Sequence, residues 1–270
     1  MPPLHLVFDA STLLHRPKGG HQLKPTGLKQ TVFNAFANLP EHLVKVTITL
    51  PAKEGRQVQE LKQLNLGHAR LVPHAEAVSG DWYFTNSRLK GMRNHAQGLP
   101  TTVIQPNHFT EKHNTPNTLA LGWDLDGVVF KEDTLYKNLD TSDPSHKSVY
   151  YTRCANQPRM VLQPGPFAHV LQKLVNLQPH LAEHGLTLEL GAITARGKRA
   201  IDIATHSLKT LFTHLHFDSF HAMDGKPKQP IIKATGIDLF IDDTPHHLKG
   251  LAGHSAAGWV PPVFVPKPQG

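Results

Sequence analysis

Two pairs of carboxylates mark points in the chain where an apolar run ends. Asp124 and Asp126 are one residue apart in "DLDG", and Asp242 and Asp243 are adjacent at the end of "IDLFIDD". On a strand, side chains two residues apart point to the same face, and Gly127 would let the chain turn away sharply. One carboxylate of such a pair can attack a phosphorus atom while the other handles the proton of the leaving oxygen. An acid–glycine turn after a strand is common, so this pair alone is a weak signal.

The adjacent acids Asp242 and Asp243 are the most specific of the isolated signals. Two neighbouring carboxylates at a buried strand end repel each other unless a cation compensates them. Mg²⁺ favours a few carboxylates together with water and substrate phosphate, so the pair predicts a magnesium site. Thr194 ends a further apolar run in "ITAR", just before a predicted helix. Its hydroxyl and the helix amides would suit a phosphate oxygen, although threonine here is also an ordinary helix cap.

The elements that must position these residues alternate between strands and helices from residue 119 onward. This alternation predicts a parallel, doubly wound α/β sheet of Rossmann-like type. Ligands of such sheets bind at the carboxyl ends of the strands, where Asp124, Thr194 and Asp242 are expected. The predicted strands lie within 119–130, 186–194, 215–220 and 237–243, and the predicted helices span 164–185, 197–212 and 229–236.

Taken together and in this order, the motifs resemble those of the haloacid dehalogenase superfamily over residues 119 to 262. "DLDGVVF" is similar to its first motif, "ITAR" to its second and "IDD" to its fourth. The resemblance implies that Asp124 is a nucleophile that forms an aspartyl-phosphate and that Asp126 is a general acid and then a general base. Dehalogenases of the superfamily lack the second aspartate of the first motif, so Asp126 favours phosphate chemistry.

The same resemblance implies a substrate site and a metal site. Thr194 would hold the phosphoryl group, with Ala195 and Arg196 beside it as further substrate-binding candidates. Mg²⁺ would be bound by the following residues: Asp124, Asp242 or Asp243, and the backbone carbonyl of Asp126.

The superfamily also has a lysine, its third motif, that offsets charge between the nucleophile and the transferring phosphoryl group. The segment "GKPKQPIIKATG" offers Lys226, Lys228 and Lys233. Lys226 and Lys228 are expected in the loop beside the active site, whereas Lys233 is expected near the far end of the next helix. Both Lys226 and Lys228 remain catalytic candidates, and the Lys-Pro pair makes Lys226 more similar to the family motif.

The first 115 residues look like a reduced copy of the second half. The match places Asp9 over Asp124 and Thr49 over Thr194, although chance matching of apolar segments can give part of it. The residues over the remaining acids are not acidic: Ser11, Thr85 and Asn86. No counterpart of the lysine segment is found. We therefore expect two tandem haloacid dehalogenase-like domains, a catalytically dead one at 1–117 and an active one at 118–270, with only a small flap inserted at about 131–161.

Composition limits the class of protein and its partners. The 270 residues are 39% hydrophobic and 18% charged, which suits a folded core, and no stretch approaches the length of a membrane span. The net charge is +7, and residues 1–118 contain 13 Lys/Arg against 7 Asp/Glu. This charge alone would support a nucleic-acid partner. No signal peptide is recognised, and the single cysteine, Cys154, is expected to be a structural thiol. A cytoplasmic protein is the default expectation.

The sequence therefore favours a Mg²⁺-dependent phosphomonoesterase acting on a nucleotide, a nucleic-acid end or another phosphorylated molecule. Two alternatives stay open: a non-catalytic binding or scaffold protein, and a phosphotransferase that uses the same site. A transition-metal site formed by histidines of "THLHFDSFH" is a further possibility, and its candidates are His214, His216 and His221.

Overall fold

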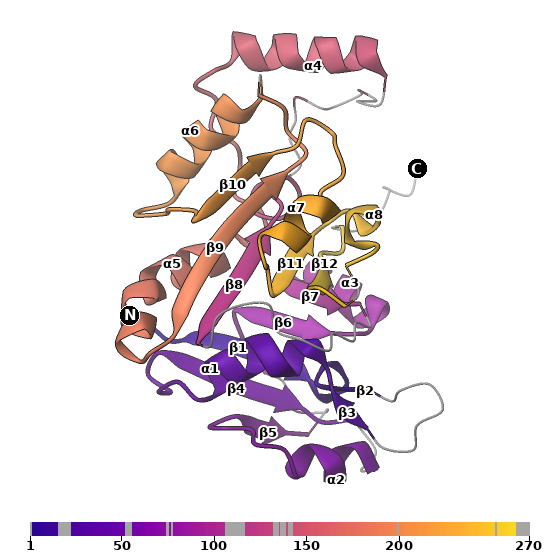
Figure 1. The fold of residues 1–270 in the computed structure, drawn as a ribbon, viewed down its shortest axis with the longest axis vertical. Coiled ribbons are helices and arrows are strands. Elements are labelled where there is room, and N and C mark those ends of the chain that lie inside the picture. Colours follow the sequence, from indigo (N-terminus) through magenta and orange to yellow (C-terminus); the bar gives the residue numbers. More distant parts are fainter. Residues whose placement is uncertain are drawn as a thin grey trace.

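The structure is a computed structural model that describes residues 2–15, 23–51, 56–73, 76, 78–105, 117–131, 135, 139, 143–198, 200–251 and 253–262. Its centre is one ten-stranded sheet with the order β10-β9-β8-β11-β12-β7-β6-β1-β4-β5 (Figure 1). In the first half the strands are β1 (Leu4–Asp9), β4 (Val44–Thr49), β5 (Arg70–Val72), β6 (Trp82–Thr85) and β7 (Thr101–Ile104). In the second half they are β8 (Thr118–Trp123), β9 (Thr187–Thr194), β10 (Ser219–Ala222), β11 (Leu239–Asp242) and β12 (Ala256–Trp259). A small separate hairpin pairs β2 (Leu14–His15) with β3 (Lys24–Pro25).

Neighbouring strands are parallel within each half and antiparallel only where the halves meet. At that junction Gly258 and Trp259 of β12 pair with Ile104 and Val103 of β7. Counted from its own first strand, each half has the same order, third-second-first-fourth-fifth. Both halves of the chain therefore contribute to one sheet. The boundary expected at 117 and 118 falls directly before β8.

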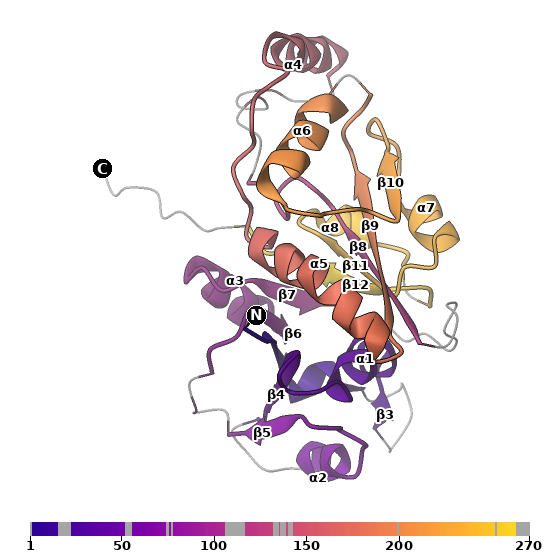
Figure 2. The ribbon, with the colours of Figure 1, turned by 90° about the vertical axis from the view of Figure 1, so that its left-hand side faces the viewer.

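Helices cover both faces of the second-half sheet, as its continuous apolar strands require. Leu239 and Ile241 of β11 belong to the same core as α5 and α6, whereas Phe240 packs in the core beneath α7 and α8. Figure 2 shows α5 and α6 on one side of these strands and α7 on the other. The helices are α1 (Asn34–Ala37), α2 (Arg56–Lys62), α3 (Arg88–Ala96), α4 (Pro144–Asn156), α5 (Ala168–Glu183), α6 (Ile201–Leu211), α7 (Gln229–Ala234) and α8 (Pro245–Leu248), with a 3-10 turn at Ala10–Thr12 and a π-helical turn at Lys29–Phe33.

A cluster of aromatic rings joins the two halves. Trp82 of β6 and Trp123 of β8 have ring centroids 5.5 Å apart, and the ring of Phe167, at the start of α5, lies 6.0 Å from each. All three side chains are fully buried. The halves therefore share a hydrophobic core as well as a sheet.

Three sequence-based expectations need correction. The strand expected at 215–220 begins four residues later, as β10. The strand β12 was not expected, because its short segment of small residues resembles a loop. The stretch at about 131–161, in which no helix was predicted, contains the helix α4, which begins at Pro144 and is capped by the side chain of Asp143. Residues 132–134, 136–138 and 140–142 of this insert lie outside the described residues.

Among the residues that the structure describes, no helix has the length and apolar character needed to cross a membrane.

Candidate active site

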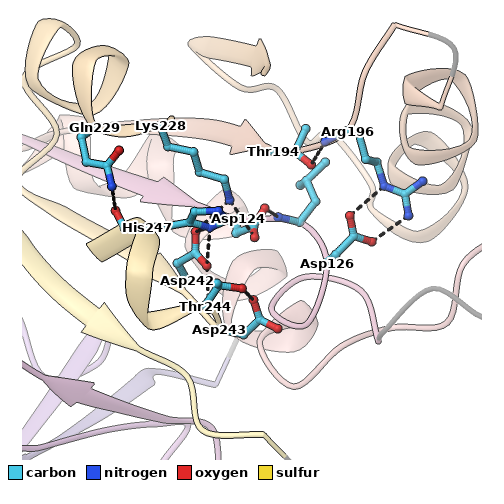
Figure 3. A network of polar contacts seen from close by, with 11 residues as sticks. Asp124, Asp126, Thr194, Arg196, Lys228, Gln229, Asp242, Asp243, Thr244 and His247 are labelled. Atoms are coloured by element: carbon cyan, nitrogen blue, oxygen red, sulfur yellow. Dashed lines mark hydrogen bonds and ion pairs between the residues drawn. The ribbon is translucent and has the colours of Figure 1, made fainter. Parts of the chain in front are cut away.

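Asp124, Lys228 and Asp242 meet at the carboxyl ends of β8 and β11. Lys228 Nζ lies 2.8 Å from Asp124 Oδ2 and 2.8 Å from Asp242 Oδ2, and all three side chains are buried (Figure 3). The parallel pairing of β8 with β11 aligns the two acids, since the Asp124 amide donates to the carbonyl oxygen of Ile241. Lys228 is the N-cap residue of α7, directly before the helix begins. Two carboxylates from neighbouring strands thus share one ammonium group.

Of the three lysine candidates, the structure places Lys228 beside the acids, whereas the sequence favoured Lys226. Lys226 is exposed in the loop before α7, and Lys233 is exposed on α7 itself. Only Lys228, among these three candidates, is buried against the acids. The loop before α7 was expected to supply the lysine, but which lysine faces the acids depends on the residue at which α7 starts.

His247 is a member of the site that sequence reasoning missed. Its Nδ1 lies 3.0 Å from Asp242 Oδ2, and it comes from α8, the short helix that begins at Pro245, two residues after the acid pair. Ligand atoms of Asp124, Asp242 and His247 lie within 4.8 Å of one another. This is the one group with metal-ligand geometry among the described residues, and it does not include the histidines His214, His216 and His221. In the sequence, His247 could have been recognised only by its position, four residues after Asp243 and within the first helical turn that follows.

Burial and mutual repulsion perturb the acids in different directions. Burial, followed by the charges of neighbouring aspartates, raises the pKa of Asp124 well above its usual range, although Lys228 opposes this. Burial, with the charge of Asp242, also raises the pKa of Asp243 to about 6. Burial alone would raise the pKa of Asp242 too, but the hydrogen bond from His247 and the charge of Lys228 outweigh it and lower that pKa.

Asp126 points away from Lys228 and is held by Arg196. The guanidinium of Arg196 donates from Nε to Asp126 Oδ2 at 2.8 Å and from Nη2 to Oδ1 at 2.7 Å. Its Nη1 donates to the hydroxyl of Tyr150 on α4, at 3.0 Å. Arg196, expected as a substrate-binding residue, is therefore engaged by a carboxylate and linked to the insert.

Thr194 and Ala195 end β9 beside these groups. Thr194 is fully buried, and its hydroxyl accepts a hydrogen bond from the Arg196 amide at 3.2 Å. Ala195 is exposed, and its carbonyl oxygen accepts from the amide of Gly225 at 2.9 Å. Thr194 thus lies at the end of β9, the neighbour of the strand β8 that leads into Asp124.

Gly127 permits the close approach of the first motif to Asp243. Its φ of 74° is unfavourable for other residues, and a Cβ at this position would lie 2.1 Å from Asp243 Oδ2. The turn after the first acid pair therefore depends on glycine both for its conformation and for the space it leaves.

The charges of the site fit a divalent cation. The four aspartates of the site face two permanent cations, Lys228 and Arg196, so the acids outnumber the charges that can neutralise them. Burial is the main cause of the raised pKa values of Asp124 and Asp243, and the charges of neighbouring aspartates add to it. Carboxylate oxygens are the ligands that Mg²⁺ prefers. The acids of the cluster can therefore hold a divalent metal.

The equivalent edge of the first half carries a different set of residues. Asp9 ends β1 and accepts a hydrogen bond from Thr49 of β4 at 2.6 Å, and Lys90 of α3 forms an ion pair with it. The Ser11 hydroxyl donates to Asn86 Oδ1 at 2.9 Å. Lys90 was not expected, because it comes from a helix and not from a loop that resembles the lysine segment.

The α/β fold and the acid–lysine site are those of a haloacid dehalogenase-type phosphatase. A family model described as 5'-nucleotidase matches residues 67–266, which is well over half of the chain, and the chain belongs to this family. Its members are phosphoric monoester hydrolases, and this chain is one of them. The matched span begins before β5, so it crosses the expected domain boundary. Searches among curated proteins and among solved structures gave no match.

Proposed function

We propose that this protein is a Mg²⁺-dependent 5'-nucleotidase that hydrolyses nucleoside monophosphates through a phosphorylated Asp124. The observation that carries the proposal is the position of Lys228 between Asp124 and Asp242, in a buried site where aspartates outnumber permanent cations. The family match supports a nucleotide as the substrate.

In the first step a carboxylate oxygen of Asp124 attacks the phosphorus atom. The bond from phosphorus to the leaving 5'-oxygen breaks, and Asp126 gives that oxygen its proton. In the second step a water molecule attacks the phosphorus of the aspartyl-phosphate, Asp126 accepts its proton, and inorganic phosphate leaves Asp124 free. Lys228 stabilises the negative charge that grows on the transferring group, while Thr194 holds one of its oxygens.

Asp126 has to leave the fork of Arg196 before it can reach the leaving oxygen. Because Arg196 also donates to Tyr150, the helix α4 is linked to this movement. Arg196 is therefore a positioning residue, and the insert that carries α4 helps to set the position of the acid–base group.

When bound, Mg²⁺ supplies positive charge to the phosphoryl oxygens and to the acids that lack a partner. Asp124, Asp242, Asp243 and the carbonyl oxygen of Asp126 would hold it. His247 supports Asp242 through its hydrogen bond and so keeps that carboxylate in place.

A cavity of about 790 Å³ between α4 and the end of β10 suits the nucleoside. It adjoins the phosphoryl site, since the amide of Met223 in its lining donates to the carbonyl oxygen of Thr194 at 2.8 Å. Tyr151 and Phe220 line the cavity and offer aromatic faces, on which a base can stack. Lys226 lies in the same cavity, which gives it a role in substrate binding.

We further infer that residues 1–117 form a non-catalytic copy of the second half. The shared strand order supports this, together with the positions of Asp9 and Thr49 at the ends of β1 and β4. With Ser11 and Asn86 where the second half has acids, no acid–base carboxylate and no metal-binding acid stands at these positions.

The proposal is tested by phosphate release from the purified full chain. Adenosine 5'-monophosphate, adenosine 3'-monophosphate and p-nitrophenyl phosphate are compared with Mg²⁺ and with excess chelator. We expect turnover of the 5'-monophosphate with Mg²⁺, none with chelator, and none for Asp124→Asn. Equal rates for the 3'- and 5'-monophosphates would contradict the substrate class, and an active Asp124→Asn variant would contradict the nucleophile.

A further inference from the structure

A second cavity, of about 670 Å³, lies where β1, β4 and β6 end and α3 begins. We call it the α3 cavity. Small-molecule sites commonly have volumes of roughly 300–1,000 Å³. By strand order this is the position that the catalytic acids occupy in the second half. The proposed reaction makes no use of it, so its lining needs a separate explanation.

The carboxylate in the α3 cavity is already neutralised by protein groups. Asp9 forms an ion pair with Lys90 and accepts a hydrogen bond from Thr49. Where further acids would stand, Ser11 and Asn86 are hydrogen-bonded to each other. Unlike the active site, this cavity therefore carries no excess negative charge and has no electrostatic need for a metal ion.

The helix α3 adds a positive charge, Arg93, that no carboxylate of the described residues balances. Lys90, Arg93, Asn94 and Gln97 all line the cavity, at the three- and four-residue spacing that places side chains on one face of a helix. Among the described residues no ion pair is recorded for Arg93, and its side chain is exposed. The formal charge of the lining is therefore +1, which favours an anionic ligand.

The other wall of the cavity is apolar. Leu50 and Pro51 follow β4, and Leu89 stands on α3 with 70% of its surface exposed. An exposed leucine beside two cations suits a ligand that has an anionic group at one end and an apolar or aromatic body at the other. Charge-assisted hydrogen bonds from lysine and arginine are strong with phosphate oxygens.

We propose that the α3 cavity binds a phosphate-bearing small molecule of the nucleoside monophosphate kind, without a metal ion and without hydrolysing it. The phosphate lies against Lys90 and Arg93, and the nucleoside lies against Leu89 and the end of β4. Hydrolysis does not follow, because Asp9 is held by two partners and Ser11 cannot replace the acid–base carboxylate.

The test measures binding in the full chain with turnover removed. The background is Asp124→Asn in excess chelator, where the remaining acids of the active site outnumber its cations and disfavour phosphate. Adenosine 5'-monophosphate, inorganic phosphate and adenosine are titrated by calorimetry. Because no turnover is read, a failure of the proposed hydrolysis would leave this result unaffected.

Two variants and one control locate the binding. Arg93→Gln removes a charged donor and should weaken binding of the monophosphate by about 10-fold or more. Leu89→Asp, at an exposed position that the fold tolerates, adds a negative charge and should abolish binding. Lys45→Gln removes the same charge from an exposed position of β4 outside the cavity and should bind as the background does.

Each outcome decides the proposal. Tight binding of the monophosphate, weaker binding of phosphate and loss in both cavity variants would support it. Adenosine binding as tightly as its monophosphate would overturn the phosphate contact. Equal affinities in Arg93→Gln and Lys45→Gln, or no binding at millimolar ligand, would overturn the site.

Discussion

Lys228 Nζ lies 2.8 Å from Asp242 Oδ2, and both side chains are closed off from solvent. Burial alone would lower the pKa of Lys228, but the charges of Asp124 and Asp242 hold it above its ordinary value. The ammonium group is therefore charged throughout the neutral range. The positive charge beside the nucleophile is therefore preorganised and needs no rearrangement when the substrate binds.

Lys228→Met should reduce kcat by about 10²–10³-fold, the usual loss when one preorganised electrostatic partner is removed. Lys233→Met, on the exposed face of the same helix, is the matched control and should keep full turnover. Circular dichroism with Mg²⁺ present checks that both variants fold. If Lys228→Met retained half of the activity in the folded state, the lysine would have no part in the chemistry.

Asp126→Asn should lose more activity on substrates whose leaving oxygen needs a proton than on substrates whose leaving group is a stable anion. General acid–base groups contribute about 10²–10⁴-fold. The loss should be large for adenosine 5'-monophosphate, whose alkoxide needs a proton, and small for p-nitrophenyl phosphate, whose leaving group is already stable as an anion. Steady-state rates on the two substrates give the ratio. Equal losses on both would assign Asp126 to the metal or to the fold instead.

The sequence predicted the location of those site residues whose place depends only on their position along the backbone. Asp124, Thr194 and Asp242 end parallel strands, and such ends meet at one edge of a sheet. It did not predict Lys228 over Lys226, or His247, because their side-chain directions depend on the first turns of α7 and α8. Lys90 was missed for the same reason: its contact with Asp9 spans 81 residues and depends on how α3 packs.

Mg²⁺ binding should weaken with acid because protons compete for Asp243. With its pKa raised to about 6, Asp243 binds more protons in the folded metal-free protein than in the unfolded chain between pH 3.8 and about 6. The contribution of Asp243 to the stability of the metal-free protein therefore falls as pH rises through this window. Above about pH 6, bound Mg²⁺ should restore that contribution. The affinity for Mg²⁺ should be about tenfold weaker at one pH unit below that pKa than at neutral pH.

The stabilisation of the fold by Mg²⁺ gives a readout independent of activity. The Tm increase on adding Mg²⁺ should be larger at neutral pH than near pH 5, and small in Asp243→Asn. That variant should also make the metal-free protein more stable at neutral pH, because a buried repulsion is gone. If Asp243→Asn kept the full Tm response to Mg²⁺, Asp243 would not be a metal ligand.

Ca²⁺ should bind without supporting turnover, because its larger and looser coordination shell misplaces the reacting groups.

The fold was predictable where apolar runs were long. The segments of β8, β9 and β11 are rich in large apolar residues and were found, whereas β12 has three small residues before Trp259 and was not. The joining of the two halves into one sheet could not be predicted. It depends on the pairing of β7 with β12 and on the contact of Trp82 with Trp123, which lie in segments far apart in the chain.

That junction leads to the last prediction, which concerns the second half on its own. In residues 118–270 alone, β12 would become an unpaired edge, and Trp123 and Phe167 would lose the ring of Trp82. Exposing one large apolar side chain costs about 1.5–3 kcal/mol, and a free apolar edge strand promotes aggregation. We expect this half to aggregate when expressed alone and to form a soluble, active complex when co-expressed with residues 1–117. Size-exclusion chromatography and phosphate release measure both. A milder control in the full chain, Trp82→Phe, should lower Tm while turnover at low temperature persists. A monomeric 118–270 with full activity would mean that the shared sheet is not needed to fold the active site.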